Sequence, residues 1–381
     1  MKRLALWDLG FRPFYLLASL FAALSVALWA AQYSGWLPRA YLAGSVWHAH
    51  EMLFGYAMAV IAGFLFTAVR NWTQRPTPTG WLLAGYALLW VAGRVLVLTP
   101  YALAAAIVNV AFPLAVAAGI AIPLVRSGNR RNYIFIALLT AIGIAALCVH
   151  LAIMGAIQWP ARIGLRAGLD LVLFIVIVVA GRVTPMFTNN AIPGAGAHRS
   201  GPIETLSIAS ILALLASDVM GWTAAANVVA AVGAVAHACR LALWHPWKTL
   251  RTPLVWILHA SYAWIVIHLA LRSPVFAAFV PDALATHALT IGVIGGMTIG
   301  MMTRTARGHS GQPLVAGRAE VAAYSLVMLA ALIRVFGGLL APQWYMASVT
   351  LSAACWSAGF ATYAVRYAPF LVLPRADGQP G

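Results

Sequence analysis

Two histidines and a glutamate stand close together at the start of a long apolar segment, in the run Trp47-His48-Ala49-His50-Glu51-Met52-Leu53-Phe54-Gly55. The chain has only 8 acidic residues among its 381 residues, so a carboxylate in such surroundings is unusual. Ionisable side chains are costly inside a bilayer, and where they occur they usually serve a function. Because imidazole is a frequent ligand of haem iron, copper and zinc, this run predicts a metal or cofactor site. Glu51 is then the expected partner of a ligand imidazole.

The composition predicts the kind of protein that must position this run. Hydrophobic residues make up 63% of the chain, charged residues only 8%, and the mean hydropathy is +0.88. A soluble domain carries about 25% charged residues, so we expect an all-α integral membrane protein that forms a single polytopic domain over residues 1–381. Twelve apolar runs reach the length of about 20 residues that crosses a bilayer core. They lie near 14–31, 46–69, 80–98, 102–125, 133–157, 166–187, 203–220, 222–243, 253–271, 283–303, 319–340 and 344–366.

The basic residues predict the orientation of this bundle. A net charge of +16 could indicate a nucleic-acid-binding protein, but the distribution of the charge argues for a membrane topology. With twelve spans and the N-terminus inside, 18 of the 24 Lys and Arg residues fall on the inner side. The other six are Arg39, Arg94, Arg162, Arg166, Arg272 and Arg334. This bias follows the positive-inside rule, so we expect both termini in the cytoplasm, the lipid bilayer as the main surrounding and no nucleic-acid partner.

The expected topology gives each histidine a depth. One group falls in the outer half of the membrane and could converge on one site: His48, His50, His150, His268 and His287. Asp170 adds a carboxylate on that side, whereas His237 and His259 fall nearer the inner side. A lone histidine in a span is as often an interhelical hydrogen bond as a ligand, and this alternative applies to His150, His237 and His268.

Helical spacing refines the prediction for the first run. In an unbroken α-helix His48 and Glu51 share a face with Gly55, whereas His50 points roughly the opposite way, toward Phe54. The two histidines are therefore expected to serve two adjacent centres, or one centre and one structural hydrogen bond. Small residues spaced four apart, in the sets Gly55, Ala59, Gly63 and Gly292, Gly296, Gly300, predict close helix packing. No Cys-x-x-Cys-His sequence occurs, so any haem would be held non-covalently.

Several long motifs resemble the NnrS family, and they follow one another along the whole chain. They are Gly10-Phe11-Arg12-Pro13-Phe14, the Trp47–Gly55 run, Ala62-Gly63-Phe64-Leu65, Gly181-Arg182-Val183 through Pro193, Leu258-His259, Thr286-His287-Ala288-Leu289-Thr290 and Gly300-Met301-Met302-Thr303-Arg304. The resemblance implies a bacterial inner-membrane protein with haem and copper, linked to denitrification and to tolerance of nitric oxide. Carried over motif by motif, the expected functional residues are His48, His50, Glu51, His259 and His287.

The leading hypothesis is a protein with one or two haem b groups, with copper as a further cofactor, that binds or turns over nitric oxide or iron-nitrosyl species. His50 and His287 are the expected axial ligands, followed by His259 and His268, and the expected metal ligands are His48, His50, His259 and His287. Glu51 and His48 are the expected catalytic groups, and a quinol is one expected electron donor. Whether the protein is an oxidoreductase stays open, because a transporter or channel for a small solute or metal, or a non-catalytic nitric oxide sensor, would also use buried histidines.

Overall fold

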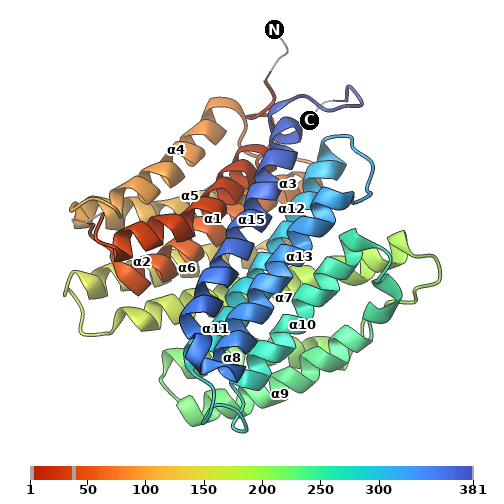
Figure 1. The fold of residues 1–381 in the computed structure, drawn as a ribbon. Coiled ribbons are helices and arrows are strands. Elements are labelled where there is room, and N and C mark those ends of the chain that lie inside the picture. The colour runs from red at the N-terminus through yellow and green to blue at the C-terminus, as the bar shows by residue number, and fades with distance from the viewer. Residues whose placement is uncertain (1–3, 37–39, 380–381) are drawn as a thin grey trace. The chain divides into compact units, whose positions relative to one another are not determined.

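The computed structural model describes residues 4–36 and 40–379, and the described residues form helices and no strands (Figure 1). Twelve long helical segments lie at the twelve predicted positions. Ten of them are long and apolar enough to cross a membrane, so the protein is a multi-pass membrane protein. The other two segments are α4 (Gly80–Leu96), which is shorter than any of the ten, and α15 (Tyr345–Val372). Lys2, Arg3 and Arg39, which entered the charge count, lie outside the described residues.

The chain divides into two compact units. The first comprises residues 4–171 together with 305–313 and 364–379, and the second comprises residues 172–304 and 314–363. The helices that begin in the first unit are α1 (Phe11–Tyr33), α2 (Gly44–His50), α3 (Met58–Thr73), α4, α5 (Ala102–Arg126), α6 (Ile134–Ile153) and α7 (Ala161–Ala191). Those that begin in the second are α8 (Gly201–Val219), α9 (Thr223–Ala242), α10 (Pro253–Leu271), α11 (Asp282–His287), α12 (Gly296–His309), α13 (Arg318–Leu332), α14 (Gly338–Leu340) and α15.

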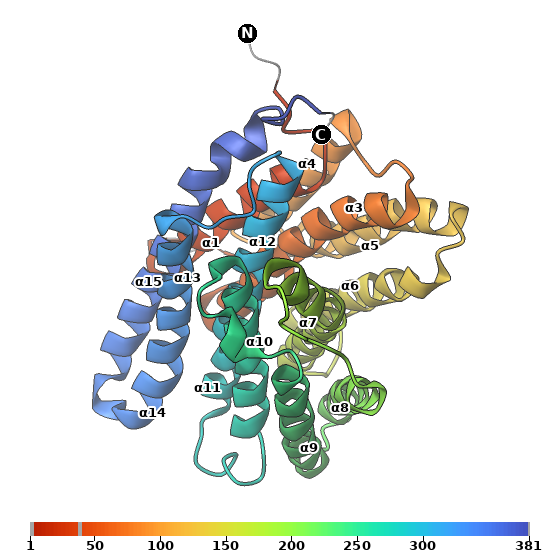
Figure 2. The ribbon, with the colours of Figure 1, turned by 90° about the vertical axis from the view of Figure 1, so that its right-hand side faces the viewer.

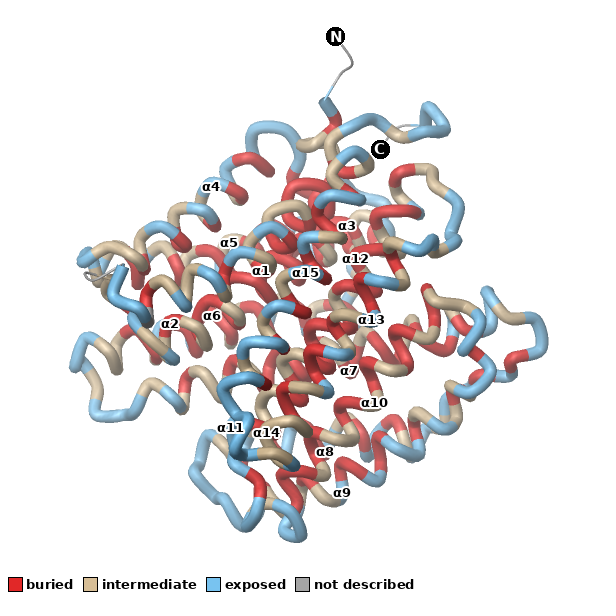
Figure 3. Tube along the Cα trace, viewed as in Figure 1, coloured by how far each residue is buried: buried red, intermediate tan, exposed pale blue. Residues whose placement is uncertain are grey.

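Each unit is built around one strongly buried helix. In the first unit α3 packs against α1 and α5, and most of its residues are buried (Figure 3). In the second unit α10 packs against α9, and α8 and α9 run side by side (Figure 2). The outer helices alternate buried and exposed apolar residues, as expected of helices with one face toward lipid. The histidine-rich run lies on α2 and the turn that leads into α3, and His259 lies on α10.

Three of the long segments contain π-helical turns, in which backbone hydrogen bonds run from residue i to i+5. They are Glu51–Ala57 (η1), which joins α2 to α3, Ala288–Gly295 (η4), which joins α11 to α12, and Ile333–Gly337 (η5), which joins α13 to α14. Such turns are rare and are frequent at functional sites. Two of the three begin directly after a predicted ligand, namely His50 and His287.

The two ends of the chain lie together in the first unit. The backbone N–H of Ala5 donates a hydrogen bond of 2.8 Å to the carbonyl of Val372 at the end of α15. The described segments next to the two termini are therefore neighbours in the fold.

The glycine-rich face of the segment 282–309 packs against α10, as predicted. A methyl group added at Gly292 would overlap the ring of Trp264, and one added at Gly296 would overlap the hydroxyl of Ser261. These glycines therefore allow close helix contact, which is the packing role that small residues have in membrane bundles.

We expect Gly292→Ala to lower the free energy of unfolding by about 1–3 kcal/mol, because the new methyl group must displace the Trp264 side chain from a packed position. Gly85→Ala on α4 is the matched control, since nothing lies within 4 Å of its added methyl group. Alanine is the better helix former, so this control should keep or slightly raise stability. Thermal unfolding midpoints in detergent test the pair, and equal midpoints for both variants would contradict the packing argument.

Candidate functional site

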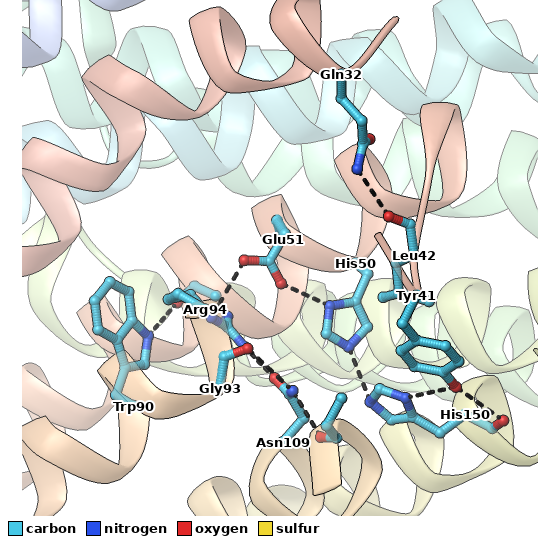
Figure 4. A network of polar contacts seen from close by, with 12 residues as sticks. Gln32, Tyr41, Leu42, His50, Glu51, Trp90, Gly93, Arg94, Asn109 and His150 are labelled. Carbon is cyan, nitrogen blue, oxygen red and sulfur yellow. Dashed lines mark hydrogen bonds and ion pairs between the residues drawn. The ribbon is translucent and has the colours of Figure 1, made fainter. Parts of the chain in front are cut away.

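A buried carboxylate lies at the centre of a polar network in the first unit (Figure 4). His50 is the last residue of α2 and Glu51 is the first of the π-helical turn, and both are fully buried. The Nδ1 atom of His50 lies 2.8 Å from Oε1 of Glu51. The other oxygen, Oε2, lies 3.2 Å from Nε of Arg94 on α4, whose guanidinium also donates to the side-chain oxygen of Asn109 on α5. Glu51 therefore joins an imidazole on one side to a buried cation on the other.

A second imidazole completes the network on the far side of His50. The two Nε2 atoms of His50 and His150 face each other at 3.2 Å, and His150 lies in the last turn of α6. The hydroxyl of Tyr41, in the connection between α1 and α2, lies 3.2 Å from Nδ1 of His150. Burial raises the pKa of the Tyr41 phenol, so the hydroxyl keeps its proton.

One assignment of protons satisfies the hydrogen bonds that join Tyr41, His150, His50 and Glu51. Because Arg94 pairs with Glu51, the carboxylate is an acceptor and Nδ1–H of His50 donates to it. The Nε2 atom of neutral His50 then accepts from Nε2–H of His150, and Nδ1 of His150 accepts from the Tyr41 hydroxyl. Each donor points toward Glu51, so the four groups form one directional chain of hydrogen bonds.

The same two Nε2 atoms also have the spacing of metal ligands. Two imidazole nitrogens bound to one tetrahedral metal ion at about 2.0–2.1 Å lie about 3.3 Å apart. In metal sites the second nitrogen of a ligand histidine usually contacts a carboxylate, a carbonyl or a water, and Glu51 fills that position for His50. Copper is among the metals that imidazole suits. The residues present therefore fit a copper ion held by His50 and His150.

This pair does not fit an iron between two axial ligands. Two nitrogens on opposite sides of one iron are about 4 Å apart, twice an ordinary metal–imidazole bond. Within the described ranges no group of three or more His, Cys, Asp or Glu side chains is spaced to hold a metal ion.

The predicted division of faces holds for Glu51 and Gly55, which both face Arg94, and for His50, whose ring contacts Phe54 with centroids 5.1 Å apart. The contact between Glu51 and His50 was not predicted. Adjacent helical residues differ by about 100° in direction, which the long side chain of Glu51 bridges, and η1 changes the helical phase from Glu51 onward. His48 packs its ring against Trp29, with centroids 5.1 Å apart.

Two predicted ligands in the second unit are oriented by backbone carbonyls. Nδ1 of His268, on α10, lies 2.7 Å from the carbonyl of Ala285, and Nδ1 of His287 lies 2.5 Å from the carbonyl of Ala283. Each Nδ1–H therefore donates to the backbone, which places the basic lone pair on Nε2. Metal-bound histidines commonly have this orientation, so both side chains fit the role of a haem ligand.

His259 has protein partners at both ring nitrogens. Its Nε2 lies 3.3 Å from the carbonyl of Trp244 and 3.4 Å from the hydroxyl of Thr188, and its Nδ1 lies 3.3 Å from the carbonyl of Val255. These contacts connect α10 to α7 and to the end of α9. They are the contacts of a structural histidine, so His259 is the weakest of the predicted ligands.

A second buried network in the second unit was not predicted. The carboxylate of Glu204, on α8, accepts from Nε and an NH2 group of Arg240, on α9, at 2.7 and 2.6 Å. Arg199 donates to the same carboxylate at 2.6 Å. Arg240 also donates to the hydroxyl of Tyr262, which lies 2.6 Å from Nδ1 of His237. The position of Arg240 inside an apolar span was the available signal.

Sequence reasoning also missed three members of the first network: Tyr41, Arg94 and Asn109. Arg94 was counted only as a charge on the outer side, although it lies within the apolar segment 80–98, where an ionisable residue indicates a partner. Asn109 is likewise a polar residue inside a span. Nothing in the sequence distinguishes Tyr41 from other residues of its connection.

The fold and the site define a class: a helical multi-pass membrane protein with paired imidazoles and two buried Arg–Glu pairs in its described residues. A family model with the description "NnrS protein" matches residues 5–375. The chain therefore belongs to the NnrS family, which is linked to the nitric oxide response. No curated protein matches it.

Proposed function

We propose that this protein is a haem b protein of the bacterial inner membrane, with copper as a second metal, that binds or turns over nitric oxide or iron-nitrosyl species. Its context would be nitrosative stress tolerance and denitrification, and a quinol is one candidate electron donor. The observation that carries the proposal is the pair of facing Nε2 atoms of His50 and His150, backed by the buried carboxylate of Glu51. Family membership supports the link to nitric oxide.

The residues divide into two sets in this proposal. His50 and His150 would hold copper, and Glu51 would keep the His50 ring in its ligating orientation. His268 and His287 would ligate haem iron through Nε2. The metals, when bound, supply the affinity for nitric oxide and the capacity for one-electron transfer. The bias of Lys and Arg between the loops supports cytoplasmic termini.

The metal content of purified protein tests these assignments. We expect a haem absorption spectrum that changes on reduction with dithionite, and copper in the metal analysis. His50→Ala and His150→Ala should each remove most of the copper and leave the haem in place. Glu51→Gln should weaken copper binding about 10–100-fold, as the loss of second-sphere partners does at other metal sites. His198→Ala, at an exposed loop position, is the matched control.

The outcomes separate the alternatives. Consumption of nitric oxide with an artificial reductant would identify an enzyme, whereas a nitrosyl spectrum without consumption would identify a binding protein. Copper content unchanged in both histidine variants would refute the site. Protein free of haem and copper that conducts a solute in proteoliposomes would favour a transporter.

A further inference from the structure

Arg12 is a fully buried arginine at the start of α1, in the first unit. One of its terminal nitrogens, NH1, donates to three backbone carbonyls at the end of α15, those of Phe370, Leu371 and Leu373, at 3.2, 3.2 and 2.7 Å. Carbonyls at a helix C-terminus carry partial negative charge, so this contact stabilises the cation. The contact gives hydrogen-bond partners to NH1 of the guanidinium, and it gives none to Nε or NH2.

The remaining edge of the Arg12 guanidinium has no partner. Its Nε and NH2 atoms are buried and make no hydrogen bond, although nearly all buried polar atoms in folded proteins make one. Arginine stays protonated in proteins, so this edge keeps its charge and its donors. The Nε and NH2 groups form the edge that binds two oxygens of a carboxylate or a phosphate at once. The missing partner is therefore expected to be an oxyanion.

Most of the charged side chains around Arg12 are basic; one carboxylate, that of Asp8, acts on its charge, but neither Nε nor NH2 of Arg12 makes a hydrogen bond to it. The charges of Arg12, Arg70 and Arg375 all act on the imidazole of His309, whose ring packs against Phe11 with centroids 5.6 Å apart. Arg375 already holds a carboxylate, since its Nε and NH2 donate to Asp377 at 2.9 and 2.6 Å. These hydrogen bonds lower the pKa of Asp377 to about 2, so the carboxylate is ionised beside Arg375.

The basic cluster formed by Arg12, Arg70, Arg375 and His309 lies at the ends of membrane-spanning segments. Phe11 is the first residue of a span, His309 is the last residue of another, and Arg70 is three residues from the end of a third. The cluster is open to its surroundings, because three of its members are only half-buried: Arg70, Arg375 and His309. Basic clusters at this level attract anionic headgroups.

We propose that Arg12, with Arg70 and His309 beside it, binds the phosphate group of an anionic lipid at the membrane boundary where both chain ends lie. Arg12 would contact two phosphate oxygens through Nε and NH2, while its NH1 continues to hold α15. This role is separate from haem and copper binding.

The test uses full-length protein freed of lipid in mild detergent. Thermal unfolding midpoints are measured against increasing phosphatidylglycerol, phosphatidylcholine or inorganic phosphate. We expect the unfolding midpoint to rise saturably with phosphatidylglycerol and not with phosphatidylcholine or inorganic phosphate. In Arg12→Lys the apparent affinity for phosphatidylglycerol should be at least tenfold weaker. Lysine can still donate to the α15 carbonyls, but it cannot make the bidentate contact with two phosphate oxygens. Arg70→Gln, which leaves the α15 contact intact, should weaken binding as well.

Arg126→Lys is the matched control, because Arg126 is an exposed arginine at the end of α5. This end lies at the same boundary, since the Asn129 side chain donates to the carbonyl of Trp72 at the end of α3. The control should titrate like the unchanged protein. An equal rise with inorganic phosphate would assign the site to a free anion instead of a lipid. The proposal would be overturned if the unfolding midpoint showed no saturable rise with phosphatidylglycerol. It would also be overturned if Arg12→Lys and Arg70→Gln titrated like the unchanged protein, or if Arg12→Lys lost haem while it still bound lipid.

Discussion

Arg94→Met is expected to lower the free energy of unfolding by about 3–5 kcal/mol, the usual effect of removing one member of a buried ion pair. Glu51 is fully buried, so without Arg94 its negative charge would face only the His50 ring. The polar partner of Arg94, Asn109, would lose its contact as well. The variant should give a low yield of folded protein and a markedly lower unfolding midpoint.

A double-mutant cycle distinguishes this charge effect from lost packing. Glu51→Leu alone should also be strongly destabilising, because it leaves the Arg94 cation unpaired. The double variant Glu51→Leu/Arg94→Met should be more stable than the sum of the two losses predicts, since it removes both charges together. Losses that simply add would show that the two side chains stabilise the protein independently.

Glu204→Ala is expected to have an effect of similar size in the second unit. The side chain of Arg240 is only 1% exposed, and removing its carboxylate partner would leave a buried cation beside Tyr262. We expect a loss of about 3–5 kcal/mol in the free energy of unfolding, measured by chemical denaturation in detergent.

Arg199→Ala is the internal control, because Arg199 binds the same carboxylate from a side chain that is 44% exposed. Solvent-exposed ion pairs contribute about 0–1 kcal/mol, so this variant should be nearly as stable as the unchanged protein. If Arg199→Ala lowered the free energy of unfolding as much as Glu204→Ala, burial would not determine how much each arginine contributes to stability.

The positions of the helices were predictable because hydrophobic length alone determines which segments can cross a bilayer. The tight turn at Met220–Trp222 is an example. The runs 203–220 and 222–243 predicted two separate helices there, and α8 ends just before the turn while α9 begins just after it. Two neighbouring apolar helices can therefore be predicted from the sequence even where the loop between them is very short. Among the twelve segments α4 is the shortest, with 17 residues, because the apolar run 80–98 ends at the Thr99-Pro100 turn.

The partners within the site were less predictable than its location. The residue types of His50 and Glu51 indicated a site, but His150 reaches His50 from 100 residues away along the chain. Such pairings depend on which helices pack together and on their rotation. Both are decided by many small contacts, such as the fit of Gly292 to Trp264, that hydropathy does not record.

The π-helical turns after His50 and His287 also determine which changes in chain length this protein can accept. Deleting one residue within Glu51–Ala57 could restore ordinary α-helical spacing and would leave the segment as apolar as before. Because a π-helical turn holds about one residue more than an α-helical turn, this deletion would leave Met58–Thr73 in nearly its present rotation and keep Gly63 against Phe14 and Tyr15. Single-residue deletions should therefore be tolerated better in these two turns than elsewhere within the spans, and an alignment of relatives would show its gaps inside spans at these turns.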